Sequence, residues 1–356
     1  MLPPSPENSG SRIPRLIPSF PHRQSAHCES GVAANLLTHH GLPLSEAMAF
    51  GIGSGLFFAY LPFVRINHLP LTTFRSAPGR IIRRLAKRLG VGVTFRSFRD
   101  AASGMADLDR LLSGGVPVGA QTGVYWLPYF PPALRFHFNA HNLVVCGKEG
   151  DTYRISDPVI GEPVLCRAAD LERARFAKGP LAPNGKLFFL TSIPKTVDPV
   201  PAIREAIRDV SRLMTRIPVP LIGVRGMRYL AGQVESWPSR LGDRRALLYL
   251  GNVIRMQEEV GTGGGGFRFI YAAFLQEAAA VLDECRLLDF SQRMTAIGDR
   301  WRDFAVVGAR LCKGRPRGGD DFPALARIVR ECADAEQGLF RELDALMRSG
   351  RNGARR

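Results

Sequence analysis

An α+β N-terminal half followed by an all-α C-terminal half is the fold class that three features of the sequence predict. Before residue 195, helix-like segments come first and strand-like segments follow, joined by short turns that are typical of a mostly antiparallel sheet. A stretch at 192–201 with three prolines marks a change in composition. Beyond it, apolar residues recur at spacings of three and four, the period of an amphipathic helix.

The N-terminal half divides into a tail and a folded domain. Residues 1–24 are rich in Pro, Ser and Arg and lack an apolar segment, so we expect a disordered tail and no secretory signal. The domain over 25–195 contains a Gly-rich apolar stretch at 48–64, which is too interrupted to span a membrane. Its expected helices cover 28–40, 79–90 and 105–115, and its expected strands cover 93–98, 117–126, 141–147, 151–157 and 186–193.

The C-terminal half is predicted to form a helical domain over 202–348, followed by a basic tail at 349–356. The expected helices of this domain cover 203–217, 246–260, 267–288, 291–311 and 322–348. No internal repeat of useful period accompanies them.

Cysteine usage and composition exclude several classes of protein. The chain has 356 residues, 45% of them hydrophobic and 22% charged, as in an ordinary globular protein. Its six cysteines form no CxxC pair, so neither a zinc site nor a disulfide framework is indicated, and its histidines have no metal-ligand spacing. We therefore expect a protein of the reducing cytoplasm with no metal site and no membrane association.

The net charge of +16 leaves three interpretations open. Only six of the 48 basic residues are lysine, which is typical of a compositional bias toward arginine. An acidic protein partner or a nucleic acid are the alternatives, although no recognition helix, zinc finger or aromatic-basic alternation supports nucleic acid. The candidate docking surface for an acidic partner is the basic helix at 79–90, with a simple exposed helix as the alternative. Its basic residues are Arg80, Arg83, Arg84, Lys87 and Arg88.

Cys28 lies where a helix is expected to begin. Unpaired backbone N–H groups and the positive end of the helix dipole favour an anion there, so a thiol at this position should ionise more readily. The alternative is a small apolar residue that packs at a helix start.

His141 and Asp157 lie at the two ends of a predicted hairpin. A three-residue turn over 148–150, with Gly150 at positive φ, pairs residue 147 with 151 and places His141 directly opposite Asp157. A carboxylate beside an imidazole fixes its tautomer and stabilises the imidazolium. A two-residue turn would offset the pair, and an exposed histidine with a turn-forming Asp-Pro is the alternative.

The chain order Cys, His, Asp resembles that of papain-like hydrolases, and its spacing resembles the bacteriocin-leader peptidase branch. The segments HCESGVAANLL, FGIGSGLFFAY, YWLPYFPP, HNLVVCG and ISDP together resemble the N-terminal domain of the butirosin biosynthesis protein H family. The segment GTGGGGFRFIYAAFLQEAA at 261–279 resembles the uncharacterised domain that commonly follows it. The resemblance covers about residues 25–345.

This resemblance implies a thiol acyltransferase of secondary metabolism. The donor would be a phosphopantetheine thioester on an acidic acyl carrier protein, or an acyl-CoA, and the acceptor an amine-bearing small molecule, with no tightly bound cofactor. Cys28 would be the nucleophile, His141 the general base and acid, and Asp157 the orienting carboxylate. Gln24 would contribute to the oxyanion hole, with the backbone N–H of Cys28 as a further donor. The alternatives are a cysteine peptidase or amidase with the same triad, and a non-catalytic basic binding module.

Two further segments are open to two interpretations each. The glycine run at 261–266 precedes a helix, so Gly264, Gly265 and Arg268 could hold the phosphate of phosphopantetheine. It lacks the lysine of a P-loop, and a hinge or a close helix contact is the alternative. The aromatic run at 125–130 either lines an acyl tunnel or packs in the core.

Overall fold

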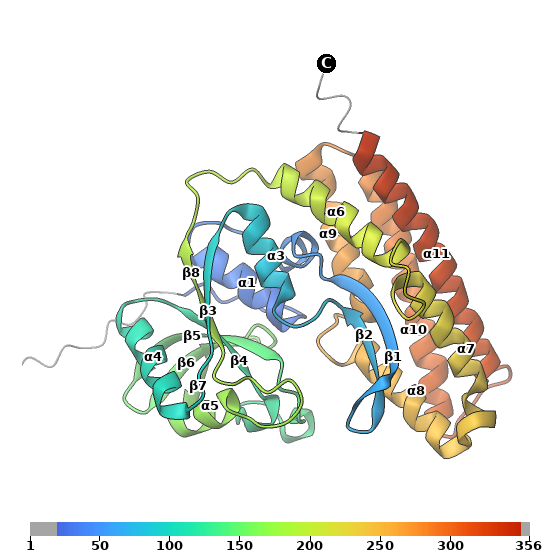
Figure 1. Cartoon of the computed structure of the whole chain (residues 1–356), viewed down its shortest axis with the longest axis horizontal. Coiled ribbons are helices and arrows are strands. Elements are labelled where there is room, and N and C mark those ends of the chain that lie inside the picture. The colour runs from blue at the N-terminus through green and yellow to red at the C-terminus, as the bar shows by residue number, and fades with distance from the viewer. Residues whose placement is uncertain (1–19, 350–356) are drawn as a thin grey trace, which may run out of the picture. The chain divides into compact units, whose positions relative to one another are not determined.

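The computed structural model describes residues 20–349 and divides them into two compact units that are interleaved along the chain (Figure 1). The sheet unit contains Phe95–Ser156 and Pro163–Phe189. The helical unit contains His22–Thr94, Asp157–Glu162 and the chain from Leu190 onward. The predicted order of an α+β region followed by an all-helical region is confirmed. The predicted tails lie largely outside the described residues, and the division at 192–201 stays a prediction about sequence domains.

The sheet has six strands in the order β3-β8-β4-β5-β6-β7. The strands are β3 (Gly92–Arg96), β4 (Val118–Thr122), β5 (His141–Glu149), β6 (Thr152–Ser156), β7 (Val164–Arg167) and β8 (Leu187–Ser192). Helices α4 (Ala101–Ser113) and α5 (Ala168–Arg175) both pack on β4, and short 3-10 turns η1 (Val124–Trp126) and η2 (Pro132–Leu134) follow it. Strand β5 is buried from His141 to Gly147, as expected for a strand covered on both faces.

The hairpin of β5 and β6 has a different register from the predicted one. Its turn contains two residues, Gly150 and Asp151, since Glu149 pairs with Thr152. Gly150 has the predicted positive φ, of 55°. A bulge at Cys146 then shifts the register back by one residue, so that Val144 pairs with Ser156. The predicted pairing of 147 with 151, and with it the direct opposition of His141 and Asp157, is wrong.

The helical unit combines elements from both halves of the sequence. From the N-terminal half it takes α1 (Cys28–His39), α2 (Glu46–Ile52), α3 (Arg80–Leu89) and the hairpin of β1 (Leu56–Ile66) and β2 (Leu69–Arg75). From the C-terminal half it takes α6 (Pro199–Thr215), α7 (Gly223–Leu241), α8 (Asp243–Glu258), the short turn η3 (Gly265–Phe267), α9 (Arg268–Leu282), α10 (Arg286–Cys312) and α11 (Phe322–Ser349). Figure 1 shows α11 beside α7, with which it packs.

Several elements of this unit were not predicted. The hairpin of β1 and β2 lies where the sequence shows only an apolar stretch with glycines and prolines, and its turn depends on left-handed Asn67 and His68. Helix α7 also went unpredicted, and the predicted helix over 267–288 ends at Leu282, because Asp283 adopts a left-handed conformation.

Helices α2 and α9 show how closely the two halves of the sequence are joined in this unit. A Cβ on Gly51 would lie 2.0 Å from the ring of Phe274, so only glycine allows this approach. No helix within residues 20–349 is long and apolar enough to cross a membrane.

Candidate functional site

Cys28 is the first residue of α1, as the sequence predicts, and its side chain is buried, with 6% of its surface exposed. The helix begins there because His27 has an extended backbone, with φ −117° and ψ 125°. The next nine residues are all buried, so the helix that carries the thiol lies inside the helical unit.

A carboxylate that the sequence analysis did not identify lies beside this helix start. Glu46, the first residue of α2, accepts hydrogen bonds from the backbone nitrogens of Ala26 at 3.0 Å and His27 at 2.6 Å. Burial raises the pKa of Glu46, although these hydrogen bonds oppose the rise. A charged Glu46 offsets part of the positive potential that the α1 dipole offers to the Cys28 thiolate.

A second buried carboxylate, Glu29, connects α1 to α3. It accepts hydrogen bonds from the backbone nitrogens of Gly79 at 3.1 Å and Ile81 at 3.0 Å, at the start of α3. It also forms an ion pair with Arg75, whose side chain is 13% exposed. The α3 N-terminus and Arg75 therefore compensate the Glu29 charge directly after Cys28.

The ring of His27 is held through both nitrogens. Its Nε2 lies 2.7 Å from Arg75, and because a guanidinium only donates, Nε2 accepts and Nδ1 carries the proton. Nδ1 then donates to the hydroxyl of Ser30 at 2.8 Å. The backbone nitrogen of Ser30, 3.4 Å away, faces this protonated nitrogen, so the tautomer that binds Arg75 leaves no acceptor for it there. Both ring nitrogens of His27 therefore have polar partners in the helical unit, and the extended backbone of His27 begins the helix.

His141 is placed by the sheet unit. It opens β5, pairs with Thr122 at the end of β4, and is buried with 4% of its surface exposed. The edge of its ring meets Phe130, with the ring centroids 5.6 Å apart. The predicted strand over 117–126 stops at Thr122, since residues 124–126 form a 3-10 turn.

Asp157 begins a short segment, Asp157–Glu162, that belongs to the helical unit and packs on α1. The carboxylate is fully buried and accepts a hydrogen bond from the backbone nitrogen of Val159 at 3.2 Å. The carbonyl of the next residue, Pro158, accepts from the nitrogen of Ser25 at 2.6 Å. A Cβ on Gly31 would lie 2.6 Å from the Pro158 ring, so this glycine lets the segment pack on α1. The structure thus brings the Asp157 segment and the Cys28 helix together.

Gln24 is exposed and lies four residues before Cys28. Its Oε1 is 3.9 Å from the place that a Cβ on Gly161 would take, so it lies near the loop that follows Asp157. Its part in an oxyanion hole stays a prediction.

The predicted phosphate site has another role. Arg268 is fully buried, pairs with both carboxylate oxygens of Glu336 at 3.0 Å, and donates to the carbonyl of Gly266 at 2.7 Å. The nitrogen of Gly264 donates to Thr262, and that of Gly265 to Glu258, each at 3.0 Å. These groups bind other groups of the protein, and phosphate binding by them stays a prediction.

The basic helix α3 presents only part of its charge to solvent. Arg88 points inward, bonding the carbonyl of Ile52 at 2.5 Å and Asp209 of α6 at 3.0 Å. Arg84 also turns toward Asp209, at 3.8 Å. The exposed basic residues of this helix are Arg80, Arg83 and Lys87, which we call the α3 basic face.

The aromatic run at 125–130 divides between surface and core. Tyr125 and Trp126 are 42% and 39% exposed, whereas Leu127 and Phe130 are buried. Tyr125 stacks on His137, with the centroids 4.2 Å apart. Phe130 is therefore the member of the run that lies against a predicted site residue.

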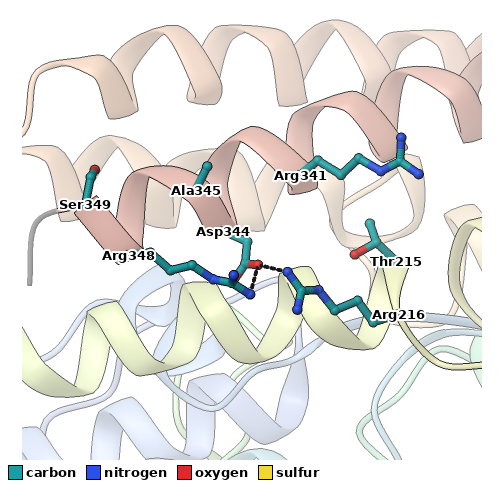
Figure 2. Close-up of a pocket in the computed structure, with 7 residues that line it drawn as sticks. All are labelled: Thr215, Arg216, Arg341, Asp344, Ala345, Arg348 and Ser349. Carbon is teal, nitrogen blue, oxygen red and sulfur yellow. Dashed lines mark hydrogen bonds and ion pairs between the residues drawn. The ribbon is translucent and has the colours of Figure 1, made fainter.

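A surface cavity of about 710 Å³ lies elsewhere in the helical unit and contains none of the predicted site residues (Figure 2). Asp344 of α11 binds Arg216 at 2.5 Å and Arg348 at 2.8 Å across it. Arg216 follows the last residue of α6, where a cation is favoured by the negative end of the helix dipole. We assign this arginine pair a structural role.

Three other buried cysteines have surroundings that distinguish them from Cys28. All six are free thiols. Burial raises the pKa of Cys146 to about 11 and that of Cys166 to about 12, and burial also raises the pKa of Cys332. None of these three lies at the start of a helix. Within residues 20–349, no three His, Cys, Asp or Glu side chains come together as a metal site requires.

Comparisons with known proteins cover both halves of the chain. Among solved structures, the chain is similar to one described as a C39-like peptidase from Bacillus anthracis, with 16% identity over 49% of this chain and 96% of that chain and a TM-score of 0.35. No curated protein matches the chain. Residues 27–158 match the family model described as butirosin biosynthesis protein H, N-terminal, and residues 169–343 match the domain of unknown function DUF4872. The chain therefore contains a domain of the butirosin biosynthesis protein H, N-terminal, family at 27–158, followed by a DUF4872 domain at 169–343.

Proposed function

We propose that this protein is a thiol acyltransferase of the reducing cytoplasm that carries an acyl group on Cys28. The observation that carries the proposal is the position of Cys28 as the first residue of α1, within a match to the butirosin biosynthesis protein H N-terminal domain. Asp157 adds support, because its buried carboxylate lies on a segment that packs against α1.

The proposed reaction has two steps. The Cys28 thiolate attacks the carbonyl carbon of a phosphopantetheine thioester, a new C–S bond forms, and the pantetheine thiolate leaves and takes up a proton. An amine then attacks the acyl-enzyme, His141 accepts the amine proton, and the Cys28 sulfur leaves. Asp157 holds the imidazole in the tautomer that can accept this proton, and Gln24 and the Cys28 backbone nitrogen donate to the developing oxyanion.

The proposed donor is carried by an acidic acyl carrier protein, with an acyl-CoA as the alternative. The α3 basic face and the net charge of +16 support this choice, because complementary charge accelerates docking. The acceptor is an amine-bearing small molecule.

Hydrolysis by a cysteine peptidase or amidase is the second candidate, favoured by the same position of Cys28 at a helix start. The two functions differ in what removes the acyl group from the enzyme. A peptidase needs only water, whereas a transferase holds the acyl-enzyme until an amine arrives.

Intact-protein and peptide mass spectrometry with a short acyl-pantetheine thioester tests the proposal. We expect one acyl group on the Cys28 peptide, lost on adding an amine and retained for longer in buffer alone. Cys28→Ala should abolish the adduct, whereas Cys285→Ala, which removes an exposed cysteine, should not. Asp157→Asn should slow acyl transfer about 100-fold or more with the fold intact, since an amide can hold the wrong imidazole tautomer.

An adduct on another cysteine would refute the role of Cys28. Release at equal rates with and without amine would favour the hydrolase. No adduct at all, with a folded protein and a peptide bond cleaved instead, would do the same.

A further inference from the structure

The glycine-rich segment at 261–266 packs directly on the chain that enters α1. A Cβ on Gly261 would lie 3.5 Å from the carbonyl oxygen of Ala26, and a Cβ on Gly263 would lie 3.3 Å from the Ala26 side chain. Both segments belong to the helical unit, although they come from opposite halves of the sequence. The residues directly before Cys28 therefore have a neighbour from the DUF4872 half of the chain.

Phe267, at the end of this segment, has an unusual backbone. It follows four consecutive glycines with positive φ and has a φ of 70° itself. Glycine adopts this conformation without steric cost, but for a bulky residue it is a genuine outlier. Such a conformation persists only where the surroundings determine it, and it is enriched at functional sites.

Aromatic contacts hold Phe267 in place. Its ring stacks on Phe50 of α2, with centroids 5.2 Å apart and planes within 4°. The Phe267 ring is also perpendicular to the ring of His27, with the centroids 5.1 Å apart and an angle of 89° between the planes. The His27 ring packs in the same T-shaped way on Phe50, with the centroids 5.9 Å apart. Arg75 and Ser30 bind the two nitrogens of the His27 ring, so polar and aromatic contacts together fix its orientation.

His27 is the residue through which this packing reaches the nucleophile. It is the N-cap of α1, and its extended backbone sets the direction in which the chain enters the helix at Cys28. We propose that Phe267 is a positioning residue for Cys28, acting through the ring of His27, and that the DUF4872 half of the chain is thereby part of the nucleophile's surroundings. The inference rests on the proposed role of Cys28.

The pH profile of Cys28 alkylation by iodoacetamide, measured on the full chain by peptide mass spectrometry, tests the inference. We expect Phe267→Leu to raise the midpoint of the profile by about 0.5 pH unit, because a loosened helix start favours the thiolate less. With a short acyl-pantetheine thioester, kcat should fall about tenfold while KM changes less than about twofold, as for a residue that orients the reacting group.

Phe340→Leu is the matched control, because Phe340 is equally buried but lies on α11 against Tyr271. It should lower thermal stability like Phe267→Leu and leave the alkylation profile unchanged. If both variants keep the wild-type profile, or both shift it equally, Phe267 is a core residue only.

His27→Asn provides a second test that does not depend on Phe267→Leu folding. Asparagine caps helices well but has no ring, so the profile should shift in the same direction. An unchanged profile overturns the inference. Failure of the proposed function would give a different result from failure of this inference. In that case Cys28 of the wild-type protein would not be alkylated faster than the other cysteines.

Discussion

Two arginines of the helical unit, Arg268 and Arg75, differ in how their charge is used. Arg268 is fully buried, pairs with Glu336 through two hydrogen bonds, and lies over the rings of Phe74 and Trp301. Trp301 adds a third hydrogen bond to the same carboxylate, at 3.1 Å. In this buried ion pair, each charge is compensated by the other and by neutral hydrogen-bonding groups.

Arg75 instead divides its donors between a carboxylate and an imidazole. It pairs with Glu29 and also binds Nε2 of His27, the two residues that flank Cys28. The comparison indicates that the first arginine stabilises the fold, whereas the second sets the electrostatic surroundings of the proposed nucleophile. Variants of these two arginines and of a neighbouring carboxylate test this difference.

The largest expected effect is on stability, from Arg268→Met. Removing one partner of a buried ion pair leaves an uncompensated charge, so we expect a loss of about 3–5 kcal/mol in the free energy of unfolding. Chemical denaturation would measure it.

Arg302→Met is a control for this variant, since Arg302 is exposed and contacts only the ring of Phe269 among the aromatic side chains described, with its guanidinium 4.3 Å from the ring centre. It should cost no more than about 1 kcal/mol. Equal losses for the two variants would refute the special role of the Arg268 pair.

An intermediate effect is expected on reactivity, from Arg75→Gln. This change removes the cation but keeps a hydrogen-bond donor. The negative charges of Glu29 and Glu46 near Cys28 are then less compensated. Alkylation at neutral pH should slow about threefold to tenfold, because the midpoint of the profile moves to higher pH.

Glu46→Gln should have the opposite sign and move the midpoint to lower pH, because it removes the carboxylate that lies at the start of α1. Glu277→Gln, which removes a carboxylate bound instead to the Ser45 hydroxyl at 2.7 Å, should change the midpoint less. Shifts of the same sign for Arg75→Gln and Glu46→Gln would contradict an electrostatic origin.

An effect of similar size, confined to the carrier-linked donor, is expected at the surface, on α3. Changing Arg80, Arg83 and Lys87 to Glu should raise KM for a carrier-linked donor about threefold to tenfold at low salt, and leave a short pantetheine thioester unaffected. Steady-state kinetics at two salt concentrations would measure this.

Arg84→Glu with Arg88→Glu should instead impair both donors, since these side chains bind Asp209 and the carbonyl of Ile52. Equal losses on both donors for the α3 basic face would mean that it supports the fold rather than a partner.

The sequence by itself determined the local features of this protein. Apolar periodicity identified most helices of the C-terminal half, and the start of α1 at Cys28 was predicted because helix signals lie within a few neighbouring residues. The short motifs were sufficient to predict the N-terminal domain and the DUF4872 domain that follows it, because each motif is contiguous in the chain.

Only the tertiary structure decided which distant residues meet. No local sequence pattern predicts that Glu46 lies at the start of α1 or that Arg268 pairs with Glu336. The contact between Phe267 and His27 is likewise not predictable from neighbouring residues. The hairpin register differs from the predicted one because its turn contains two residues instead of three, and a bulge at Cys146, in a strand that packs between β4 and β6, shifts it again. Long-range contacts of this kind result from packing of the whole chain, so residue spacing carries no signal for them.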